Sequence, residues 1–160
     1  MAEEGVAGRI LFSVHRGLPR EGPGNRESTA RALHLINGLP DAPEVLDIGC
    51  GPGMQTVDLA GLLPQAKIQA VDRHQPFLED GARRAEAAGC ADRIQFSVGD
   101  MRALSYEPAR FDLIWCEGAA YFMGIREALE AWRPLLKPGG SVAFTEAVWL
   151  TEQPPQTLLE

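Results

Sequence analysis

The stretch from Val45 to Gly53 constrains this chain more than any other. It begins with Val-Leu-Asp-Ile, a mainly apolar and largely β-branched run, as a strand covered on both faces requires. Glycines at positions 49, 51 and 53 then let the backbone turn tightly and expose its N–H groups. Apolar residues recur at helical spacing from Met54 to Leu63. A strand, a glycine turn and a helix N-terminus together hold the polar, partly anionic end of a ligand.

The spacing of the glycines narrows the type of ligand. A dinucleotide fingerprint, G-x-G-x-x-G, would place its third glycine at position 54, which is Met54. The pattern here is an acid followed by G-x-G-x-G, and the acid, Asp47, would repel a pyrophosphate but could receive a cationic amino group. At these residues the chain resembles the class I S-adenosylmethionine-dependent methyltransferases, whose first motif has this form. The turn alone is equally consistent with a tight connection in an α/β sheet.

Length and composition fit one soluble domain. With 160 residues the chain can bury roughly 70% of the surface that its unfolded form exposes. The net charge of −7 argues against a broad basic surface for nucleic acid, and no apolar run approaches the ~18 residues of a membrane span. Three cysteines without a C-x-x-C pair argue against a disulfide scaffold or a zinc site and favour a reducing compartment. We expect a cytoplasmic protein with no secretory signal and no metal.

Strand and helix patterns alternate along the chain. The sequence predicts strands at residues 44–48, 67–72, 94–98, 111–116 and 141–148, and helices at 27–39, 54–63, 77–88 and 125–136. This order predicts an α/β fold: a Rossmann-like, doubly wound, mostly parallel sheet with helices on both faces. In such a sheet the ligand lies outside the carboxyl ends of the strands, so the residues that follow each strand are the candidates for function.

Acidic residues follow the second and third predicted strands. Asp72 can accept hydrogen bonds from both hydroxyls of a ribose; the alternative is an acid favoured by a helix N-terminus. In the methyltransferases that the chain resembles, an acid after the third strand meets the adenine amine and the next residue packs on the ring. Asp100 and Met101 match these two positions, which favours the adenine interpretation over the alternative of an N-cap and a core residue.

The segment after the fourth strand lies beside the methyl group in that family. Glu117 could orient the acceptor, act as a general base or be a solvated acid, and Tyr121 could serve catalysis or packing. The motifs [DN]-P-P-[YF] and Pro-Cys of enzymes that methylate nucleic-acid bases are absent here, which favours a small-molecule acceptor. His15, in the entry segment, is a further candidate base, although an isolated histidine is more often a surface or satisfied residue.

The resemblance therefore implies two sets of site residues. The catalytic candidates are Glu117, His15 and Tyr121. The cofactor-binding candidates are Asp47, Gly49, Cys50, Gly51, Gly53, Asp72, Arg73, Asp100, Met101 and Glu117.

The resemblance runs from about residue 27 to 148 and includes Leu136-Lys137-Pro138-Gly139-Gly140, a turn common before the fifth strand of these enzymes. It implies a lid at residues 1–25, a cofactor domain at 26–150 and a tail at 151–160. Sheets of the family usually have seven strands, whereas this chain stops just past the fifth, and its final Leu-Glu pair resembles a cloning scar. We therefore expect a fragment, or a homodimer formed through the exposed fifth strand.

The function that the resemblance implies is methyl transfer from S-adenosyl-L-methionine to a small molecule by in-line displacement, with S-adenosyl-L-homocysteine as product. It implies neither a nucleic acid nor a membrane as partner. Two alternatives stay open: a domain that binds the cofactor without transferring the methyl group, and an NAD-type oxidoreductase domain.

Overall fold

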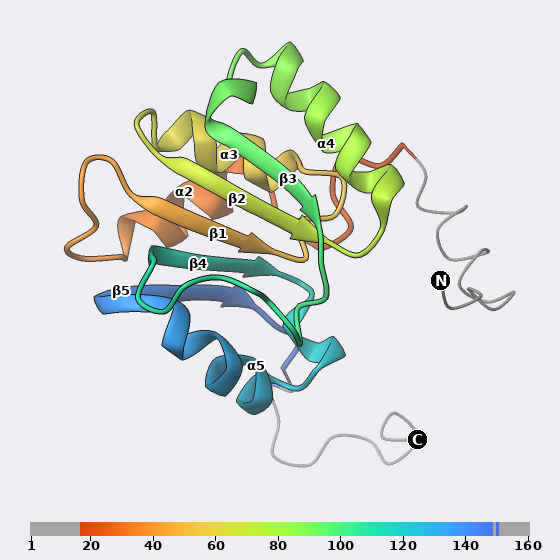
Figure 1. The fold of residues 1–160 in the computed structure, drawn as a ribbon. Helices are drawn as coiled ribbons and strands as arrows, with labels where there is room; N and C mark the ends of the chain where they lie inside the picture. Colours follow the sequence, from red (N-terminus) through yellow and green to blue (C-terminus); the bar gives the residue numbers. More distant parts are fainter. Residues whose placement is uncertain (1–16, 149, 151–160) are drawn as a thin grey trace, which may run out of the picture.

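The protein, described by a computed structural model for residues 17–148 and 150, has one parallel sheet with helices on both faces (Figure 1). The strand order is β3-β2-β1-β4-β5, and each neighbouring pair is parallel. The strands are β1 (Glu44–Ile48), β2 (Lys67–Asp72), β3 (Ile94–Val98), β4 (Phe111–Glu117) and β5 (Leu136–Thr145). The predicted fold class is confirmed.

The helices cover the two faces unequally. On one face α2, α3 and α4 pack with residues such as Val45, Ile68 and Leu113 into a buried cluster. On the other face α5 and the segment after β3 enclose a second cluster that contains Ile48, Phe111 and Trp132. The helices are α2 (Arg26–His34), α3 (Met54–Leu62), α4 (Gln75–Ala87) and α5 (Ile125–Trp132), with 3-10 turns η1 (Ala91–Arg93), η2 (Ala120–Phe122) and η3 (Arg133–Leu135). Within the described residues no helix is long and apolar enough to cross a membrane.

Two predicted helices end several residues earlier than expected, and the other two end within one residue of the prediction. The first was expected to reach position 39 but ends at His34, where the Leu35 N–H bonds to the Ala32 carbonyl in a tighter turn. Ile36 and Leu39 still pack against the core, but from a loop. The last helix was expected to continue to position 136, and α5 instead gives way to η3, because Pro134 has no N–H to continue the α-helical bonds.

The fifth strand starts earlier and ends earlier than predicted. It spans Leu136–Thr145 instead of 141–148, so the Pro-Gly-Gly sequence lies within it. The strand accommodates these residues through a register shift opposite Phe111 and Leu113, with φ +81° at Gly139. β5 forms one edge of the sheet. Pairing of this edge with a second copy stays a prediction.

The strand order creates the site. The chain moves outward from β1 to β2 and β3, then crosses back to place β4 on the other side of β1. The carboxyl ends of β1 and β4 are therefore neighbours whose connections leave in opposite directions. A crevice at this point is the usual ligand position in open parallel sheets.

Candidate functional site

The glycine turn after β1 is built as predicted. Gly49 has φ +70° and Gly51 has φ +51°, a region that side chains disfavour. The N–H groups of Gly49 and Cys50 both donate to the carbonyl of Val71, at 2.8 and 3.1 Å, which ties the turn to the end of β2. A Cβ on Gly49 would lie 2.5 Å from the Cβ of Ala119. The turn is thus locked between β2 and the segment after β4.

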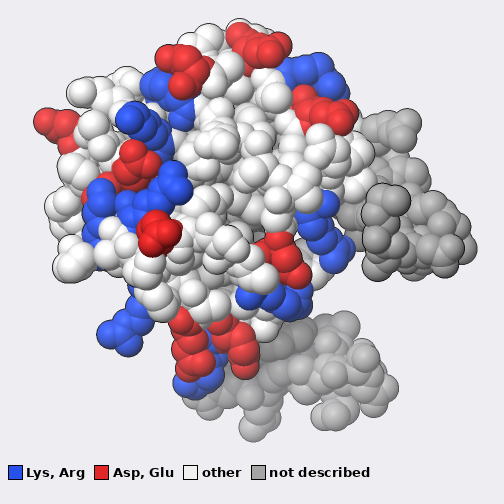
Figure 2. Space-filling model, in the orientation of Figure 1, with Lys and Arg blue, Asp and Glu red and all other residues white. Residues whose placement is uncertain are grey.

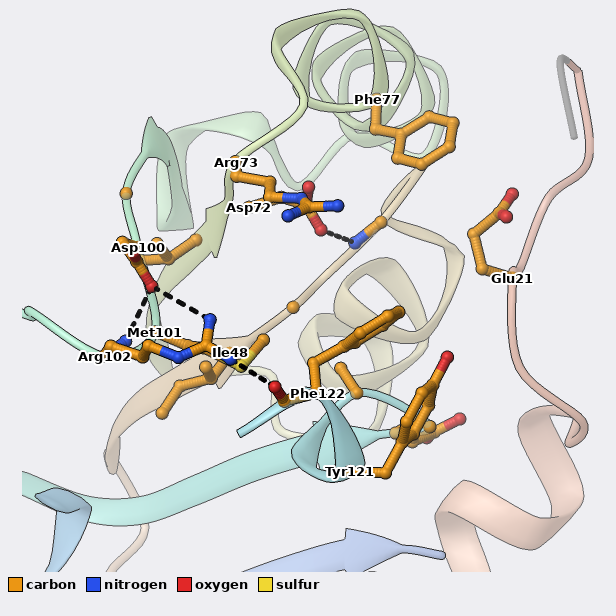
Figure 3. Close-up of a pocket in the computed structure, with 17 residues that line it drawn as sticks. Glu21, Ile48, Asp72, Arg73, Phe77, Asp100, Met101, Arg102, Tyr121 and Phe122 are labelled. Atoms are coloured by element: carbon orange, nitrogen blue, oxygen red, sulfur yellow. Dashed lines mark hydrogen bonds and ion pairs between the residues drawn. The ribbon is translucent and has the colours of Figure 1, made fainter. Parts of the chain in front are cut away.

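A cavity of about 240 Å³ opens at the carboxyl ends of β1, β2 and β4 (Figure 3). Its wall combines backbone of the glycine turn with carboxylates, arginines and aromatic rings. It is lined by Glu21, Ile48, Gly49, Gly51, Val71, Asp72, Arg73, Phe77, Gly99, Asp100, Met101, Arg102, Glu117, Gly118, Ala119, Tyr121 and Phe122. Seven of the ten predicted cofactor residues are in this set: Gly49, Gly51, Asp72, Arg73, Asp100, Met101 and Glu117.

Asp72 joins the second strand to the glycine turn. Its Oδ2 accepts from the Gly51 N–H at 2.9 Å, and its Oδ1 accepts from the His74 N–H at 2.8 Å. These bonds fix the carboxylate at the cavity wall (Figure 3). Because each oxygen has further lone-pair capacity, the group can still accept from two hydroxyls.

Asp100 and Met101 line the far end of the cavity from Glu21 (Figure 3). The Asp100 carboxylate is largely exposed and accepts from the Arg102 N–H at 2.9 Å. The carbonyl of Met101 accepts from the Trp132 indole, which holds this loop against α5. The arrangement offers an acceptor oxygen beside an apolar thioether.

Two aromatic rings and an arginine form another part of the wall. Tyr121 and Phe122 stack with their ring centroids 4.1 Å apart, and the Arg73 guanidinium lies 5.9 Å from the Phe122 ring centroid. About half of the Tyr121 side chain is exposed. Burial, with a smaller effect from Glu146, raises the pKa of its phenol, which therefore stays protonated at neutral pH.

The Glu117 side chain is the centre of a buried polar network. Only 7% of it is exposed, and its oxygens accept from Arg20 at 2.5 Å, from the Trp115 indole at 2.9 Å and from the Thr29 hydroxyl at 3.1 Å. Arg20 also bonds to Asp58 of α3, at 2.6 Å. Glu117 is thus bound to the protein's own groups as well as lining the cavity.

Sequence reasoning missed Arg20 and Glu21. Both lie in a segment rich in glycine and proline, which has no periodicity to suggest which side chains turn inward. The only available signal was an arginine next to an acid ahead of the first helix. His15, the predicted base of the same region, lies outside the described residues.

Three of the predicted cofactor residues do not line the cavity: Asp47, Cys50 and Gly53. Asp47 is fully buried; its Oδ2 accepts from the Thr56 hydroxyl at 2.6 Å, while Oδ1 has no partner within the described structure. Cys50 is also fully buried, and burial raises the pKa of its thiol well above the ordinary value. The direct contacts of these three residues with a cofactor stay predictions, and their position shows that they shape the turn from inside.

Burial raises the pKa of Asp47 to about 7, partly offset by the Thr56 hydrogen bond. The unfolded chain ionises near the ordinary value of 3.8, so folding takes up a proton between these two pH values. The stability that the neutral acid provides is complete below the unfolded pKa and is lost as the pH rises through about 7.

We expect an Asp47→Asn variant to lack this pH dependence. Relative to the variant, the wild-type chain should lose free energy of unfolding as the pH rises from about 5 to about 8. Urea unfolding of both proteins at several pH values measures the difference between their free energies of unfolding. The contributions of the other titrating groups largely cancel in this difference. A difference that stays constant over this range would show that Asp47 ionises as it does in the unfolded chain.

No group of three histidine, cysteine or acidic side chains in residues 17–148 and 150 is arranged to hold a metal ion. The three cysteines are buried and free, and burial raises the pKa of the Cys116 thiol to about 12. The ionisable side chains that line the cavity are carboxylates, arginines and one phenol. These groups can bind a ligand through hydrogen bonds and charge.

The family model described as "Methyltransferase domain" matches residues 45–140, which carry the glycine turn, Asp72, Asp100 and Glu117. This chain belongs to the methyltransferase domain family. Trans-aconitate 2-methyltransferase of Streptomyces avermitilis is 33% identical over 118 residues, 72% of this chain and 43% of that enzyme. Malonyl-(acyl-carrier protein) O-methyltransferase of Pseudescherichia vulneris is 36% identical over 104 residues, 63% of this chain and 38% of that enzyme. The chain thus spans less than half the length of these curated relatives.

Solved structures agree with this family. A methyltransferase of Thiobacillus denitrificans in complex with S-adenosyl-L-homocysteine matches with a TM-score of 0.80 and 26% identity, over 94% of this chain and 60% of that one. A Geobacter sulfurreducens methyltransferase, also in complex with S-adenosyl-L-homocysteine, matches with a TM-score of 0.79 and 26% identity, over 94% of this chain and 59% of that one.

Proposed function

We propose that this chain binds S-adenosyl-L-methionine in the cavity and transfers its methyl group to a small molecule. The observation that carries the proposal is the row of groups around one cavity: the glycine turn after β1, the acceptor Asp72 at the end of β2 and the acceptor Asp100 after β3. A nucleoside with an amino-acid tail needs acceptors for its ribose and its base at these separate points. The S-adenosyl-L-homocysteine complexes of two structural relatives support the same ligand.

Each cavity residue has a distinct role in this proposal. Asp72 accepts from the ribose hydroxyls, Asp100 accepts from the adenine amine, and Met101 packs on the ring. The glycine turn lets the amino-acid tail approach the backbone closely. When bound, the cofactor supplies a methyl group on a positively charged sulfonium sulfur. The remainder of the cofactor is then the leaving group, as a neutral thioether. The protein's main tasks are therefore to align the reactants and to exclude water.

The acceptor side of the site is formed by the segment after β4. Tyr121 lines the cavity as a protonated phenol, and it can donate a hydrogen bond to an acceptor molecule. Glu117 and His15 stay as candidate bases for a hydroxyl acceptor. Because Arg20, Trp115 and Thr29 all donate to the Glu117 carboxylate, a positioning role for Glu117 is better supported than proton abstraction.

A small-molecule acceptor is supported by the cavity at the strand ends and by the names of the relatives that methylate trans-aconitate and malonyl-(acyl-carrier protein). Figure 2 shows basic and acidic side chains interspersed over one face, instead of a single basic field. Together with the net charge of −7, this pattern does not favour a nucleic-acid partner. The three buried, free cysteines fit the expected reducing, cytoplasmic location.

Radiolabelled methyl transfer to a panel of small carboxylic acids, amines and phenols tests the activity. Label in one of these acceptors supports the proposal. Tight binding of S-adenosyl-L-homocysteine without transfer to any of them would favour the alternative of a domain that only binds the cofactor. Tight binding of NAD, with no response to S-adenosyl-L-homocysteine, would favour the oxidoreductase alternative instead.

We expect an Asp72→Asn variant to bind S-adenosyl-L-homocysteine about 10- to 100-fold more weakly, which corresponds to roughly 1–3 kcal/mol of lost charge-assisted hydrogen bonds. The amide also places a donor against either the Gly51 or the His74 N–H, which loosens the turn. Calorimetry measures the affinity. Asp92→Asn, at an exposed position of η1 away from the cavity, is the matched control. If both variants bound S-adenosyl-L-homocysteine equally well, Asp72 would not be part of the binding site.

A further inference from the structure

A buried carboxylate oxygen lies just past the end of β5. Glu146 follows Thr145, the last residue of that strand. Its Oε1 accepts from the Ala147 N–H at 2.9 Å, which fixes the direction of the carboxylate. Its Oε2 is shielded from water and, among the residues that the structure describes, has no hydrogen-bond partner. Such an oxygen has lost its hydration without compensation, so a donor that reaches Oε2 would be bound strongly.

The pairing of β4 with β5 places Glu146 on the methyl-acceptor side of the site. Glu117 at the end of β4 pairs with Thr145, and the Gly118 N–H donates to the Thr145 hydroxyl at 2.9 Å. The chain then leaves β4 and forms η2, which contains Tyr121. Glu146 and Tyr121 therefore lie just beyond the carboxyl ends of two neighbouring parallel strands.

The charge of Glu146 acts on two groups of β4 and η2. Burial is the main cause of the raised pKa of the Tyr121 phenol, and Glu146 adds to it. Glu146 also adds to the raised pKa of the Cys116 thiol, after burial and the charge of Asp47. Because charge interactions weaken with distance, the Glu146 carboxylate lies near both groups. Cys116 is buried, whereas Tyr121 is about half exposed and lines the cavity, so Tyr121 connects Glu146 with a ligand.

Tyr121 and Glu146 are complementary in hydrogen bonding. No hydrogen bond joins the phenol to another group within residues 17–148 and 150. The ring stacks on Phe122 with the centroids 4.1 Å apart, and its exposed side leaves room for it to turn. A hydroxyl donates one hydrogen bond and accepts others through its lone pairs. Once the phenol donates to Oε2, its oxygen is left as a hydrogen-bond acceptor for the ligand.

The other carboxylate of this region is already occupied. Three donor side chains of the protein, including Arg20, bond to the Glu117 carboxylate. Glu146 receives one backbone N–H, on Oε1, and keeps Oε2 for a further donor. Of these two acids, Glu146 is therefore the one that can hold the phenol.

We infer that Glu146 is the positioning residue of Tyr121: its Oε2 accepts from the phenol O–H, and the phenol oxygen then accepts from the atom to be methylated. This inference rests on the proposed function and adds the class of methyl acceptor, a molecule with a hydroxyl or amine hydrogen at that atom. A carboxylate acceptor has no such hydrogen at neutral pH, and the charge of Glu146 would repel it.

The contact between the two side chains can be tested without a methyl acceptor. The chain has two tyrosines, so fluorine NMR of protein labelled with 3-fluorotyrosine gives two resonances, and Tyr121→Phe identifies the one from position 121. We expect Glu146→Gln to lower the pKa of this phenol, because a neighbouring negative charge is removed. Glu86→Gln, at an exposed position near the end of α4, is the control and should leave the titration unchanged. An unchanged titration in Glu146→Gln would overturn the inference.

The class of methyl acceptor is tested with the panel of acids, amines and phenols. Label should enter a phenol or an amine. For that acceptor Glu146→Gln and Tyr121→Phe should each lower kcat at least about tenfold, and the double variant should lose little more, because the two side chains act as a unit. Glu146→Gln should bind S-adenosyl-L-homocysteine within about twofold of the wild type, since Glu146 does not line the cavity.

The outcomes separate this inference from the proposed function. Label only in carboxylic acids would overturn the inference and leave methyl transfer to a small molecule standing. Full activity of Glu146→Gln on a phenol or an amine would do the same. A chain that binds S-adenosyl-L-homocysteine but labels no member of the panel would overturn both.

Discussion

Replacing Gly49 by alanine is expected to destabilise the fold by about 2–5 kcal/mol and to lower the cofactor affinity more than tenfold. Two effects add. An alanine at φ +70° adopts a left-handed conformation that costs about 1–2 kcal/mol, and its Cβ would lie 2.5 Å from the Cβ of Ala119. Neither backbone can yield easily, so the overpacking costs a further ~1–3 kcal/mol. Relieving the contact would also disturb the Gly49 N–H bond to Val71, and with it the turn.

Gly89→Ala is the matched control for this variant. Gly89 follows α4 with φ +67°, but a Cβ there would meet no atom within 4 Å. It should therefore show only the conformational cost of about 1 kcal/mol and bind the cofactor normally. Thermal unfolding and binding calorimetry on both variants separate the cost of the left-handed backbone conformation from the cost of the steric contact with Ala119. If Gly49→Ala were no less stable than Gly89→Ala, the close approach to Ala119 would not hold in solution.

Arg20→Met is expected to lower the free energy of unfolding by about 3 kcal/mol, because it leaves buried carboxylates without their principal cation. Glu117 and Asp58 are only 7% and 11% exposed. Asp58 keeps a contact with Arg26 at 3.2 Å, whereas no other cation bonds to Glu117 within the described structure. Urea unfolding of the variant measures the loss.

The control for this second prediction is Arg83→Met, which removes an ion pair with Asp80 on the exposed face of α4. Arg83 is 66% exposed, and such surface pairs contribute only about 0–1 kcal/mol. Adding Glu117→Gln to Arg20→Met should recover part of the stability, because the unpaired buried charge disappears. A loss no larger than that of Arg83→Met would mean that water reaches Glu117 freely.

The sheet and the position of the cavity were predictable because they depend on local patterns. Mainly apolar, β-branched runs such as 45–48, followed by glycines, favour buried strands, and the alternation of strands and helices leaves few topologies. Asp72 and Asp100 follow directly from this, since a residue at the end of a parallel strand lies at the ligand edge. Both line the cavity as expected.

Boundaries in the last third of the chain were less predictable. Pro-Gly-Gly at 138–140 indicates a turn in isolation, but Leu136 before it and Ser141 after it both pair with β4, so these residues form an irregularity within β5. Gly139 keeps its turn-like φ of +81°, and the strand continues on both sides of it. Glu146 lies just past β5, because the last pair between β4 and β5 joins Glu117 and Thr145.

The sequence by itself determined the alternation of strands and helices, the glycine turn, and the acids that follow the strands, because each depends on residues close together along the chain. The tertiary structure alone decided that Asp47 faces the interior and that Glu117 is paired with Arg20, 97 positions away. It also decided that Glu21 forms a wall of the cavity. These contacts join segments that are distant in sequence, and a buried charge accepts whichever partner the packing of the whole chain brings within reach.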